Sequence, residues 1–298
     1  MTKKLVECVP NFSEGRRKDV IEAIVDAARK VSGIKVLNYS SDADHNRTVL
    51  TFVGNPESAK EAAFSCCAKA AELIDMEKHH GEHPRIGATD VIPFIPVADV
   101  TMEECVDLAH SLGKEIADKL NIPVYFYEEA SKRSDLRSLP QIRKGQYEGL
   151  KELIKTPERT PDAGPHTMHP TAGATAVGAR PFLIAFNINL STGDLSIAKK
   201  IAQTIREAKG GYKYCRAMGV MLEERGIAQV SINMTNFEGT PLHRVFETVK
   251  SEATRYGVNI VGSEIIGLTP MQALLDVAEF YLRLEDFSRK QVLEANLD

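Results

Sequence analysis

In the stretch Ile227-Ala228-Gln229-Val230-Ser231-Ile232-Asn233-Met234, polar and apolar side chains alternate from Gln229 to Met234. A period of two residues predicts a β-strand that buries one face in a core and keeps the opposite face polar. Another apolar run, residues 218–223, precedes this strand across the polar segment Glu224-Arg225-Gly226. Two such runs, joined by a short segment that contains glycine, predict a β-hairpin.

The segments on either side of this hairpin complete a known order of elements. A strand is predicted at 182–189, and apolar residues at helical spacing predict a helix at 197–208. Beyond the hairpin, a proline at the start and a glycine at the end indicate a helix from Thr240 to Gly257. A last apolar run predicts a strand at 259–265. The order β-α-β-β-α-β is that of the ferredoxin-like motif.

The first half of the chain repeats this order up to residue 97 and then adds a helix and a strand. We therefore expect an α/β (α+β) protein with two ferredoxin-like subdomains, residues 1–180 and 181–298. Two such subdomains that face each other would form a ligand-binding cleft between them. The expected strands of the first half lie at 5–10, 34–40, 48–53, 91–97 and 124–127, and its expected helices lie at 20–31, 56–74 and 101–120.

Residues 156–181, between the two halves, show no helical or strand periodicity and contain four prolines before residue 171. A passive linker is one interpretation, but about 26 residues is long for a connection without structure. The middle of this segment, 164–178, combines small residues with His166 and His169. Small side chains leave the backbone open to a flat ligand, which favours a binding loop.

Composition excludes several classes of protein. The chain has 298 residues and a net charge of −4, so no basic excess supports nucleic-acid binding. No run approaches the roughly 18 apolar residues of a membrane span. The five cysteines are odd in number and lack the CxxC spacing of a metal or redox site. Reduced thiols are therefore expected, in a cytoplasmic protein.

The densest cluster of reactive side chains is His79-His80-Gly81-Glu82-His83-Pro84-Arg85. The string satisfies H-x-x-E-H, an inverted zinc-protease pattern, which needs both histidines on one helical face. Gly81 and Pro84 disfavour that helix, so we expect a loop and no metal site. A solvated charged loop and a metal-free general base remain open, because a neutral imidazole moves protons near neutral pH.

Several motifs resemble the glutamate formimidoyltransferase (formiminotransferase) family, and the similarity runs over essentially the whole chain. They are Val6-Glu7-Cys8-Val9-Pro10-Asn11-Phe12-Ser13-Glu14-Gly15, Asn46-Arg47-Thr48, Gly81-Glu82-His83-Pro84-Arg85-Ile86-Gly87-Ala88, Val124-Tyr125, Gly173-Ala174-Thr175-Ala176, Phe182-Leu183-Ile184-Ala185-Phe186-Asn187, Gln229-Val230-Ser231 and Val261-Gly262-Ser263.

The resemblance implies transfer of a formimino group between tetrahydrofolate and L-glutamate in histidine breakdown. It implies two α/β subdomains that flank a folate tunnel, in a form without the cyclodeaminase domain, since the chain stops at Asp298. Tetrahydrofolate is then a one-carbon substrate, no metal is needed, and the enzyme is expected to be a homodimer. No nucleic acid or membrane partner is expected.

The resemblance also assigns residues. His83, in the family's GEHPR motif, is implied to be the catalytic base. Arg47, Arg85 and Arg180 are candidate ligands for the carboxylates of glutamate, since arginine pairs with a carboxylate through two hydrogen bonds. The folate-contacting loop corresponds to Gly164, Pro165, His166, Thr167, Met168, His169, Pro170, Thr171, Ala172 and Gly173.

Two other functions remain open at this point. A related enzyme would pass a formyl group from 5-formyltetrahydrofolate to glutamate in the same pocket. A folate-binding protein without catalysis would need no base at position 83. An imidazole with an ordinary pKa near about 6.5 serves as base and then as acid, which favours the transferases.

Overall fold

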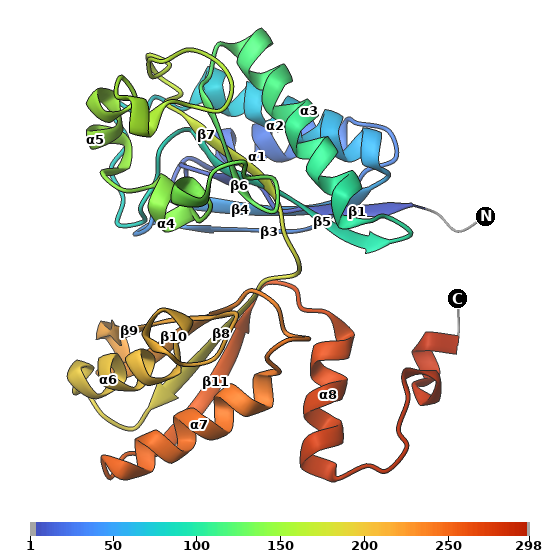
Figure 1. The fold of residues 1–298 in the computed structure, drawn as a ribbon, viewed down its shortest axis with the longest axis vertical. Coiled ribbons are helices and arrows are strands. Elements are labelled where there is room, and N and C mark those ends of the chain that lie inside the picture. The colour runs from blue at the N-terminus through green and yellow to red at the C-terminus, as the bar shows by residue number, and fades with distance from the viewer. Residues whose placement is uncertain (1–3, 297–298) are drawn as a thin grey trace. The chain divides into compact units, whose positions relative to one another are not determined.

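The structure is a computed structural model that describes residues 4–296. The chain divides into two compact units, one ending at Arg180 and the other beginning at Pro181 (Figure 1). Each unit has its own β-sheet and its own hydrophobic core. Within residues 4–296, no helix is long and apolar enough to cross a membrane.

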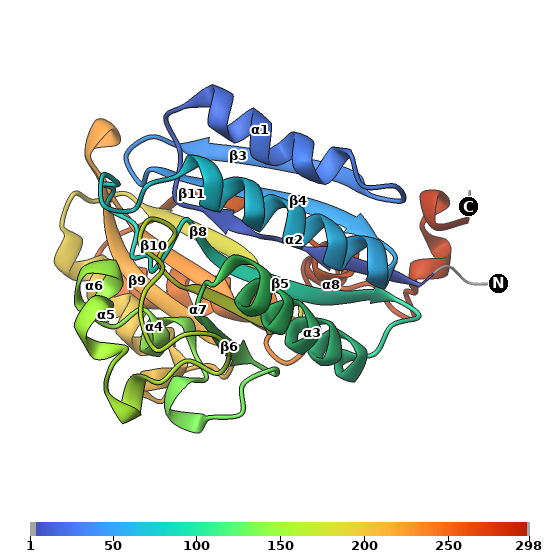
Figure 2. The same cartoon turned by 90° about the horizontal axis from the view of Figure 1, so that it is seen from above.

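The first unit begins with the expected ferredoxin-like order. Strand β4 pairs antiparallel with β3 and β1, and β1 also pairs antiparallel with β5, so the strands run β3-β4-β1-β5 across the sheet. Helices α1, α2 and α3 cover one face of this sheet and lie side by side (Figures 1 and 2). The elements are β1 (Leu5–Cys8), β2 (Asn11–Phe12), α1 (Lys18–Arg29), β3 (Lys35–Asp42), β4 (Arg47–Gly54), α2 (Pro56–Leu73), β5 (Thr89–Ala98) and α3 (Met102–Leu120).

Capping residues fix the ends of the two longest helices. The side chain of Asn55 accepts a hydrogen bond from Ser58 N at 2.9 Å, and Pro56 fills the first turn of α2. Thr101 and Glu104 form a capping box at the start of α3. Both starts were predicted from sequence, and α2 in turn sets where the loop before β5 begins.

The sheet of the first unit extends beyond the predicted order. Strand β7 (Thr175–Ala179) lies between β5 and β6 (Val124–Glu128) and runs parallel to both. The expectation that 156–181 is a structureless loop is therefore wrong for residues 175–179. This strand has no bulky apolar residue except Val177, so its sequence lacks the usual strand signal. Short helices α4 (Leu139–Ile142) and α5 (Gln146–Leu153) precede it.

The second unit has the ferredoxin-like order that the hairpin predicted. Its four strands are all antiparallel in the order β11-β8-β10-β9, and α6 and α7 pack on one face (Figure 1). Val230, Ile232 and Met234 of β10 lie in the core, as their alternation predicts. The elements are β8 (Ile184–Leu190), α6 (Leu195–Ile205), β9 (Cys215–Leu222), β10 (Ile227–Met234), α7 (Leu242–Arg255), β11 (Ile260–Ile266) and α8 (Met271–Leu282).

All five cysteines are buried free thiols, as expected from their number and spacing. Burial raises the pKa of Cys67 to about 11 and that of Cys105 to about 12, so both are protonated at neutral pH. They therefore act as small apolar side chains in the core.

Gly178 lies where β7 approaches the neighbouring strand β6 closely. A Cβ atom at this position would lie 2.4 Å from the carbonyl oxygen of Tyr127 and 2.5 Å from its ring. We expect Gly178→Ala to lower the free energy of unfolding by about 1–3 kcal/mol, the usual cost of overpacking. In α5, Gly149→Ala meets no atom within 4 Å and should be neutral or stabilising by up to about 1 kcal/mol. Urea unfolding of both variants compares them, and equal stabilities would contradict the close packing of β7.

Candidate active site

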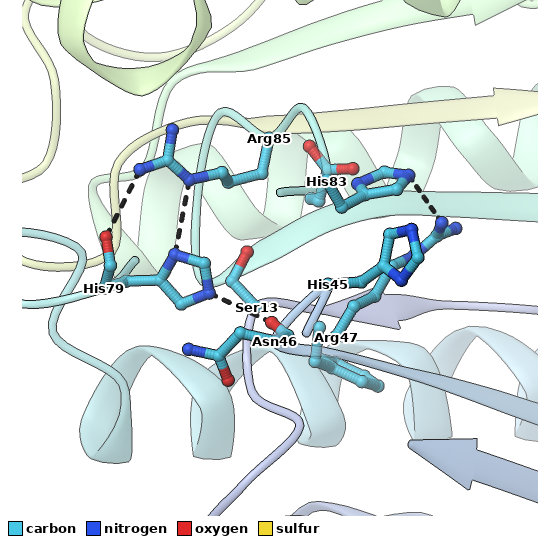
Figure 3. Close-up of a pocket in the computed structure, with 9 residues that line it drawn as sticks. Ser13, His45, Asn46, Arg47, His79, His83 and Arg85 are labelled. Carbon is cyan, nitrogen blue, oxygen red and sulfur yellow. Dashed lines mark hydrogen bonds between the residues drawn. The ribbon is translucent and has the colours of Figure 1, made fainter. Parts of the chain in front are cut away.

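A small pocket opens in the first unit where the turn between β3 and β4 meets the loop between α2 and β5 (Figure 3). Three histidines and two arginines reach it, together with one buried carboxylate. The residues that line it are Phe12, Ser13, His45, Asn46, Arg47, His79, His83, Arg85 and Asp90.

Asn46 holds the walls of this pocket together. Its backbone is left-handed, with φ of 48°, at the end of the turn that leads into β4. The amide oxygen accepts a hydrogen bond from Gly15 N at 2.8 Å, and the amide nitrogen donates to His80 O at 2.9 Å. The ring of His79 bonds through Nε2 to the Asn46 carbonyl at 3.0 Å. One buried residue therefore joins three separate segments of the chain.

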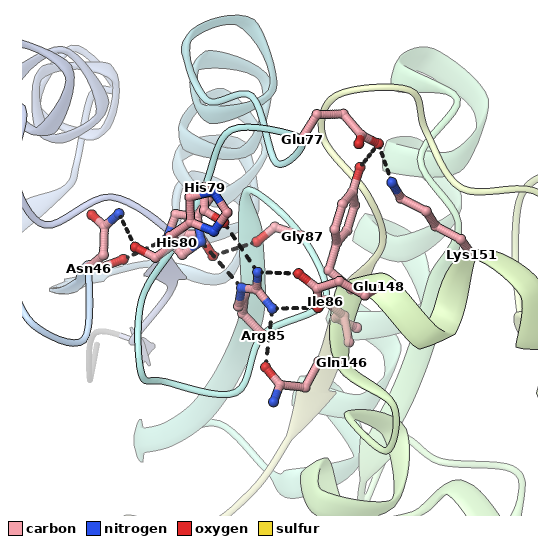
Figure 4. A network of polar contacts seen from close by, with 12 residues as sticks. Asn46, Glu77, His79, His80, Arg85, Ile86, Gly87, Gln146, Glu148 and Lys151 are labelled. Carbon is pink, nitrogen blue, oxygen red and sulfur yellow. Dashed lines mark hydrogen bonds and ion pairs between the residues drawn. The ribbon is translucent and has the colours of Figure 1, made fainter.

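Arg85 anchors the far side of the loop that carries His83 (Figure 4). Its guanidinium donates to both carboxylate oxygens of Glu148, at 2.8 and 2.6 Å, and to Gln146 Oε1 at 3.1 Å. Its Nε donates to His79 Nδ1 at 3.2 Å. The Arg85 side chain is only 7% exposed. These hydrogen bonds hold the loop in place and occupy most of the donors of Arg85, so few donors remain for a substrate carboxylate.

The loop from 74 to 88 is not helical, as Gly81 and Pro84 predicted. Both ring nitrogens of His79 already have partners, in Asn46 and Arg85. No cluster of three or more His, Cys, Asp or Glu side chains in residues 4–296 has the arrangement of a metal site.

His83 projects into the pocket beside Arg47, the first residue of β4. Arg47 Nη1 lies 2.5 Å from His83 Nε2 (Figure 3). Burial, followed by the positive charges of Arg47 and Arg143, lowers the pKa of His83 to about 3. The imidazole is therefore neutral at physiological pH. Burial likewise lowers the pKa of Arg47 to about 10, which still leaves its guanidinium charged.

Asp90, at the start of β5, is the buried carboxylate of the pocket. Its Oδ1 accepts from Ile86 N at 3.0 Å, and its Oδ2 forms an ion pair with Arg143 at the end of α4. Asp90 thus closes the turn that follows His83. The charge of Asp90 raises the pKa of His83, against the larger lowering by burial, Arg47 and Arg143.

His45 faces His83 from the turn between β3 and β4, with 6.3 Å between the ring centroids (Figure 3). Asp42 Oδ1 accepts from the His45 backbone N–H at 2.7 Å and contacts its Nδ1 at 2.9 Å. Asp42 therefore shapes the turn and orients the imidazole.

The expected folate loop, 164–173, is joined to the His83 loop at its end. Met76 N donates to Thr171 O, and Ala88 N donates to Ala172 O, both at 2.8 Å. Gly173 has φ of +74°, and a Cβ atom there would lie 2.5 Å from Ile86 O. A bulky residue at Gly173 would therefore disturb the fold itself. The earlier part of the loop keeps Gly164, His166, Thr167 and Pro170 exposed.

Two other expected loop residues have structural contacts. His169 Nδ1 accepts from Thr171 N and Ala172 N, at 3.3 and 3.0 Å, which makes His169 the centre of a tight turn. Met168 packs beside both buried clusters of the first unit. Arg180 lies directly after β7, and its backbone N–H donates to Phe94 O. It is not among the residues that line the pocket.

Sequence reasoning did not assign roles to Asn46, Asp90, Arg143 or Glu148. The signal for Asn46 was its place beside Arg47 in the Asn-Arg-Thr motif. The only signal for Asp90 was a carboxylate directly before an apolar strand. Arg143 and Glu148 lie more than 50 residues from their partners, so no local pattern could identify them.

The fold and the pocket define an α/β protein with a neutral imidazole in a polar pocket, and comparison with known families identifies its class. Residues 5–180 match the family described as "Formiminotransferase domain, N-terminal subdomain". Residues 185–295 match the family described as "Formiminotransferase domain". The chain therefore belongs to the formiminotransferase family.

Curated proteins are similar in sequence to this chain over nearly its whole length. It is 55% identical to a glutamate formimidoyltransferase of Streptococcus pyogenes over 295 residues, which cover 99% of each chain. Its identity to a glutamate formimidoyltransferase of Thermoplasma acidophilum is 49%, over 99% of this chain and 97% of the other. A formimidoyltransferase-cyclodeaminase of Gallus gallus is 49% identical over 95% of this chain, but only 53% of that protein is covered.

The low pKa of His83 predicts how the stability of the protein changes with pH. Its pKa is about 3 in the folded protein and near about 6.5 in an unfolded chain, so the unfolded state binds more protons between these values. Stability should therefore fall as pH falls through this window. His83→Gln removes this contribution, so its Tm should drop less than the wild-type Tm between pH 7.5 and 5.

Calorimetry at both pH values measures this difference. His80→Gln is the matched control, because His80 is an exposed histidine of the same loop, and it should keep the wild-type pH dependence. Equal drops in Tm for the wild type and His83→Gln would contradict a depressed His83 pKa.

Proposed function

We propose that this chain is a glutamate formimidoyltransferase, which transfers the formimino group between tetrahydrofolate and L-glutamate and so serves histidine breakdown. The observation that carries the proposal is the family match over both units together with a half-buried, neutral imidazole at His83. Relatives named for this activity match the chain from end to end, which favours it over formyl transfer or folate binding alone.

The reaction exchanges one carbon–nitrogen bond for another. The amine of glutamate gives up a proton, its nitrogen bonds to the formimino carbon, and a tetrahedral intermediate forms. The intermediate loses a second proton from that nitrogen, and the bond from the carbon to N5 of the folate then breaks. N5 keeps the electron pair and receives a proton. The transfer therefore needs a group that removes protons from one nitrogen and delivers a proton to the other.

We assign this proton transfer to His83. Because its pKa is low, the ring is neutral at physiological pH, and nearly every molecule has His83 in its base form. Once protonated, an imidazole in this setting is a strong acid, because burial and two nearby arginines favour loss of the proton. That acidity suits delivery of a proton to the departing N5.

Among the candidate arginines, Arg47 is best suited to bind a carboxylate of glutamate. It lines the pocket, contacts His83 and forms no ion pair with any residue in 4–296. Arg85 is paired with Glu148. Arg180 remains a candidate outside the pocket.

The folate site is proposed at 164–173. The exposed residues Gly164, His166, Thr167 and Pro170 offer open backbone to a flat ring, while Thr171 and Ala172 hydrogen-bond to the loop that carries His83. This connection would place the reacting folate nitrogen near the base. Tetrahydrofolate acts here as a substrate, and the proposed mechanism uses no metal.

We also propose a cytoplasmic homodimer. Five buried free thiols suit a reducing compartment. Exposed apolar side chains of the second unit, such as Phe280 and Leu282, offer a surface for a second copy. Sedimentation analysis of the purified chain tests the dimer.

His83→Ala should lower turnover by roughly 10²–10⁴-fold, the usual contribution of a general acid–base group. The substrate KM should change far less, because the loss concerns the transition state. The assay supplies tetrahydrofolate with N-formimino-L-glutamate or N-formyl-L-glutamate and identifies the folate product by mass. His80→Ala, in the same loop, is the control and should remain active.

A folded His83→Ala variant with normal turnover would place the base elsewhere. A folate product that carries only a formyl group would replace formimino transfer by formyl transfer. Circular dichroism of each variant separates loss of chemistry from loss of fold.

Arg47→Lys tests the carboxylate assignment. Lysine keeps a positive charge but cannot form two parallel hydrogen bonds to a carboxylate, so the KM for N-formimino-L-glutamate should rise about 10-fold or more. Arg137→Lys, which replaces an exposed arginine paired with Glu129, is the control. An unchanged KM in Arg47→Lys would assign the carboxylate to another residue.

A further inference from the structure

The contact between Arg47 and His83 occupies the lone pair that a base needs. The arginine guanidinium has N–H donors and no acceptor. Arg47 Nη1 therefore donates and His83 Nε2 accepts across their 2.5 Å separation. The neutral imidazole then carries its own hydrogen on Nδ1. A general base must present a lone pair to the proton that it removes. With Arg47 in this position, Nε2 presents none.

Arg47 itself lacks a negative partner. Within residues 4–296 it forms no ion pair, and its buried Nε has no hydrogen-bond partner. Asp90, the carboxylate whose charge raises the pKa of Arg47, is already paired with Arg143 and bonded to Ile86 N. A buried guanidinium that lacks an anion is costly, and a hydrogen bond to a neutral imidazole compensates only in part.

We propose that the α-carboxylate of the amino-acid substrate withdraws Arg47 from His83 and thereby frees the Nε2 lone pair. This proposal rests on the proposed function of His83 as the base. A carboxylate held by two charge-assisted hydrogen bonds is a stronger partner for a guanidinium than a neutral imidazole is. The α-carboxylate is bonded to the same carbon as the reacting nitrogen, so its capture brings that nitrogen beside His83.

The other polar groups that face His83 are held by partners of their own or are exposed, so a bound anion would not displace them from His83. Arg143 and Asp90 pair with each other at the end of α4 and the start of β5. His45 faces the ring from the turn between β3 and β4, and Asp42 holds it there. On the loop itself, the Glu82 side chain is exposed. Arg47 is therefore the charged group whose displacement by an anion alters His83.

The arrangement would make the base dependent on the substrate. Without glutamate, His83 cannot remove a proton from water, so an activated one-carbon group on the folate is protected from hydrolysis. With glutamate bound, neutralisation of Arg47 also removes a positive charge that disfavours the imidazolium. Positioning and activation then follow from one binding event.

Nuclear magnetic resonance of histidine labelled with ¹⁵N in both ring nitrogens tests this directly, because the two shifts report hydrogen bonding and protonation. L-glutamate, at a concentration that saturates turnover, should shift His83 Nε2 and raise the pKa of His83 from about 3 by about one unit or more. γ-Aminobutyrate lacks the α-carboxylate and should leave both unchanged. His83→Gln identifies the signal.

Arg47→Gln should show a raised His83 pKa without ligand and little further response to glutamate. Arg47→Lys repeats the test with the positive charge kept. The pKa of His83 should be lower in Arg47→Lys than in Arg47→Gln. Arg29→Gln, an exposed arginine of α1, is the control for loss of one positive charge. His110, which bonds to Ala130 O away from the pocket, is the internal reference.

A His83 signal that does not respond to saturating L-glutamate overturns the proposal, and so does an unchanged His83 pKa in folded Arg47→Gln. These failures differ from failure of the proposed function. If His83→Ala has lost turnover while the His83 signal ignores glutamate, His83 is the base and Arg47 does not control it. If His83→Ala keeps its turnover, the function assigned to His83 is wrong.

Discussion

The candidate active site depends on the hydrogen bonds of one buried amide, the side chain of Asn46. Asn46 occupies a left-handed backbone position, and its side chain joins the segment after β2 to the loop that carries His83. Asparagine tolerates this backbone conformation better than most residues and also supplies both a donor and an acceptor. Since Arg47 follows directly in the chain, the same bonds fix both sides of the contact between Arg47 and His83.

A second set of bonds connects this site to the strand that the sequence pattern failed to indicate. Strand β7 enters the sheet between β5 and β6, and the residues just before it hydrogen-bond to Met76, Ala88 and Ile86. The close approach needs glycine at 173, where φ is positive, and at 178, where the Tyr127 backbone leaves no room for Cβ. The small residues of this segment thus serve packing at one end and leave open backbone at the other.

Features set by residues close together in the chain could be predicted from the sequence, whereas features set by distant partners could not. The alternation of residues 229–234 and the helical spacing of apolar residues are local patterns, and they predicted the ferredoxin-like order correctly. Strand β7 was missed because it is stabilised by neighbours on both sides and not by its own apolar side chains. The motif around His83 located the pocket, but it could not separate the roles of Arg47 and Arg85. Their roles differ because Glu148, 63 residues away, pairs with one and not the other.

In the proposed mechanism, the low pKa of His83 has opposite consequences for the two proton transfers. A weakly basic imidazole takes a proton from an amine reluctantly, but the imidazolium that results gives its proton to a leaving nitrogen readily. Burial contributes most to the low pKa and persists throughout, whereas the charge of Arg47 is the part that a bound anion neutralises. A carboxylate on Arg47 therefore assists the first proton transfer, and the buried setting still favours the second. In the proposed mechanism one histidine serves both steps, because the bound carboxylate offsets the charge of Arg47 while the burial that lowers the pKa remains.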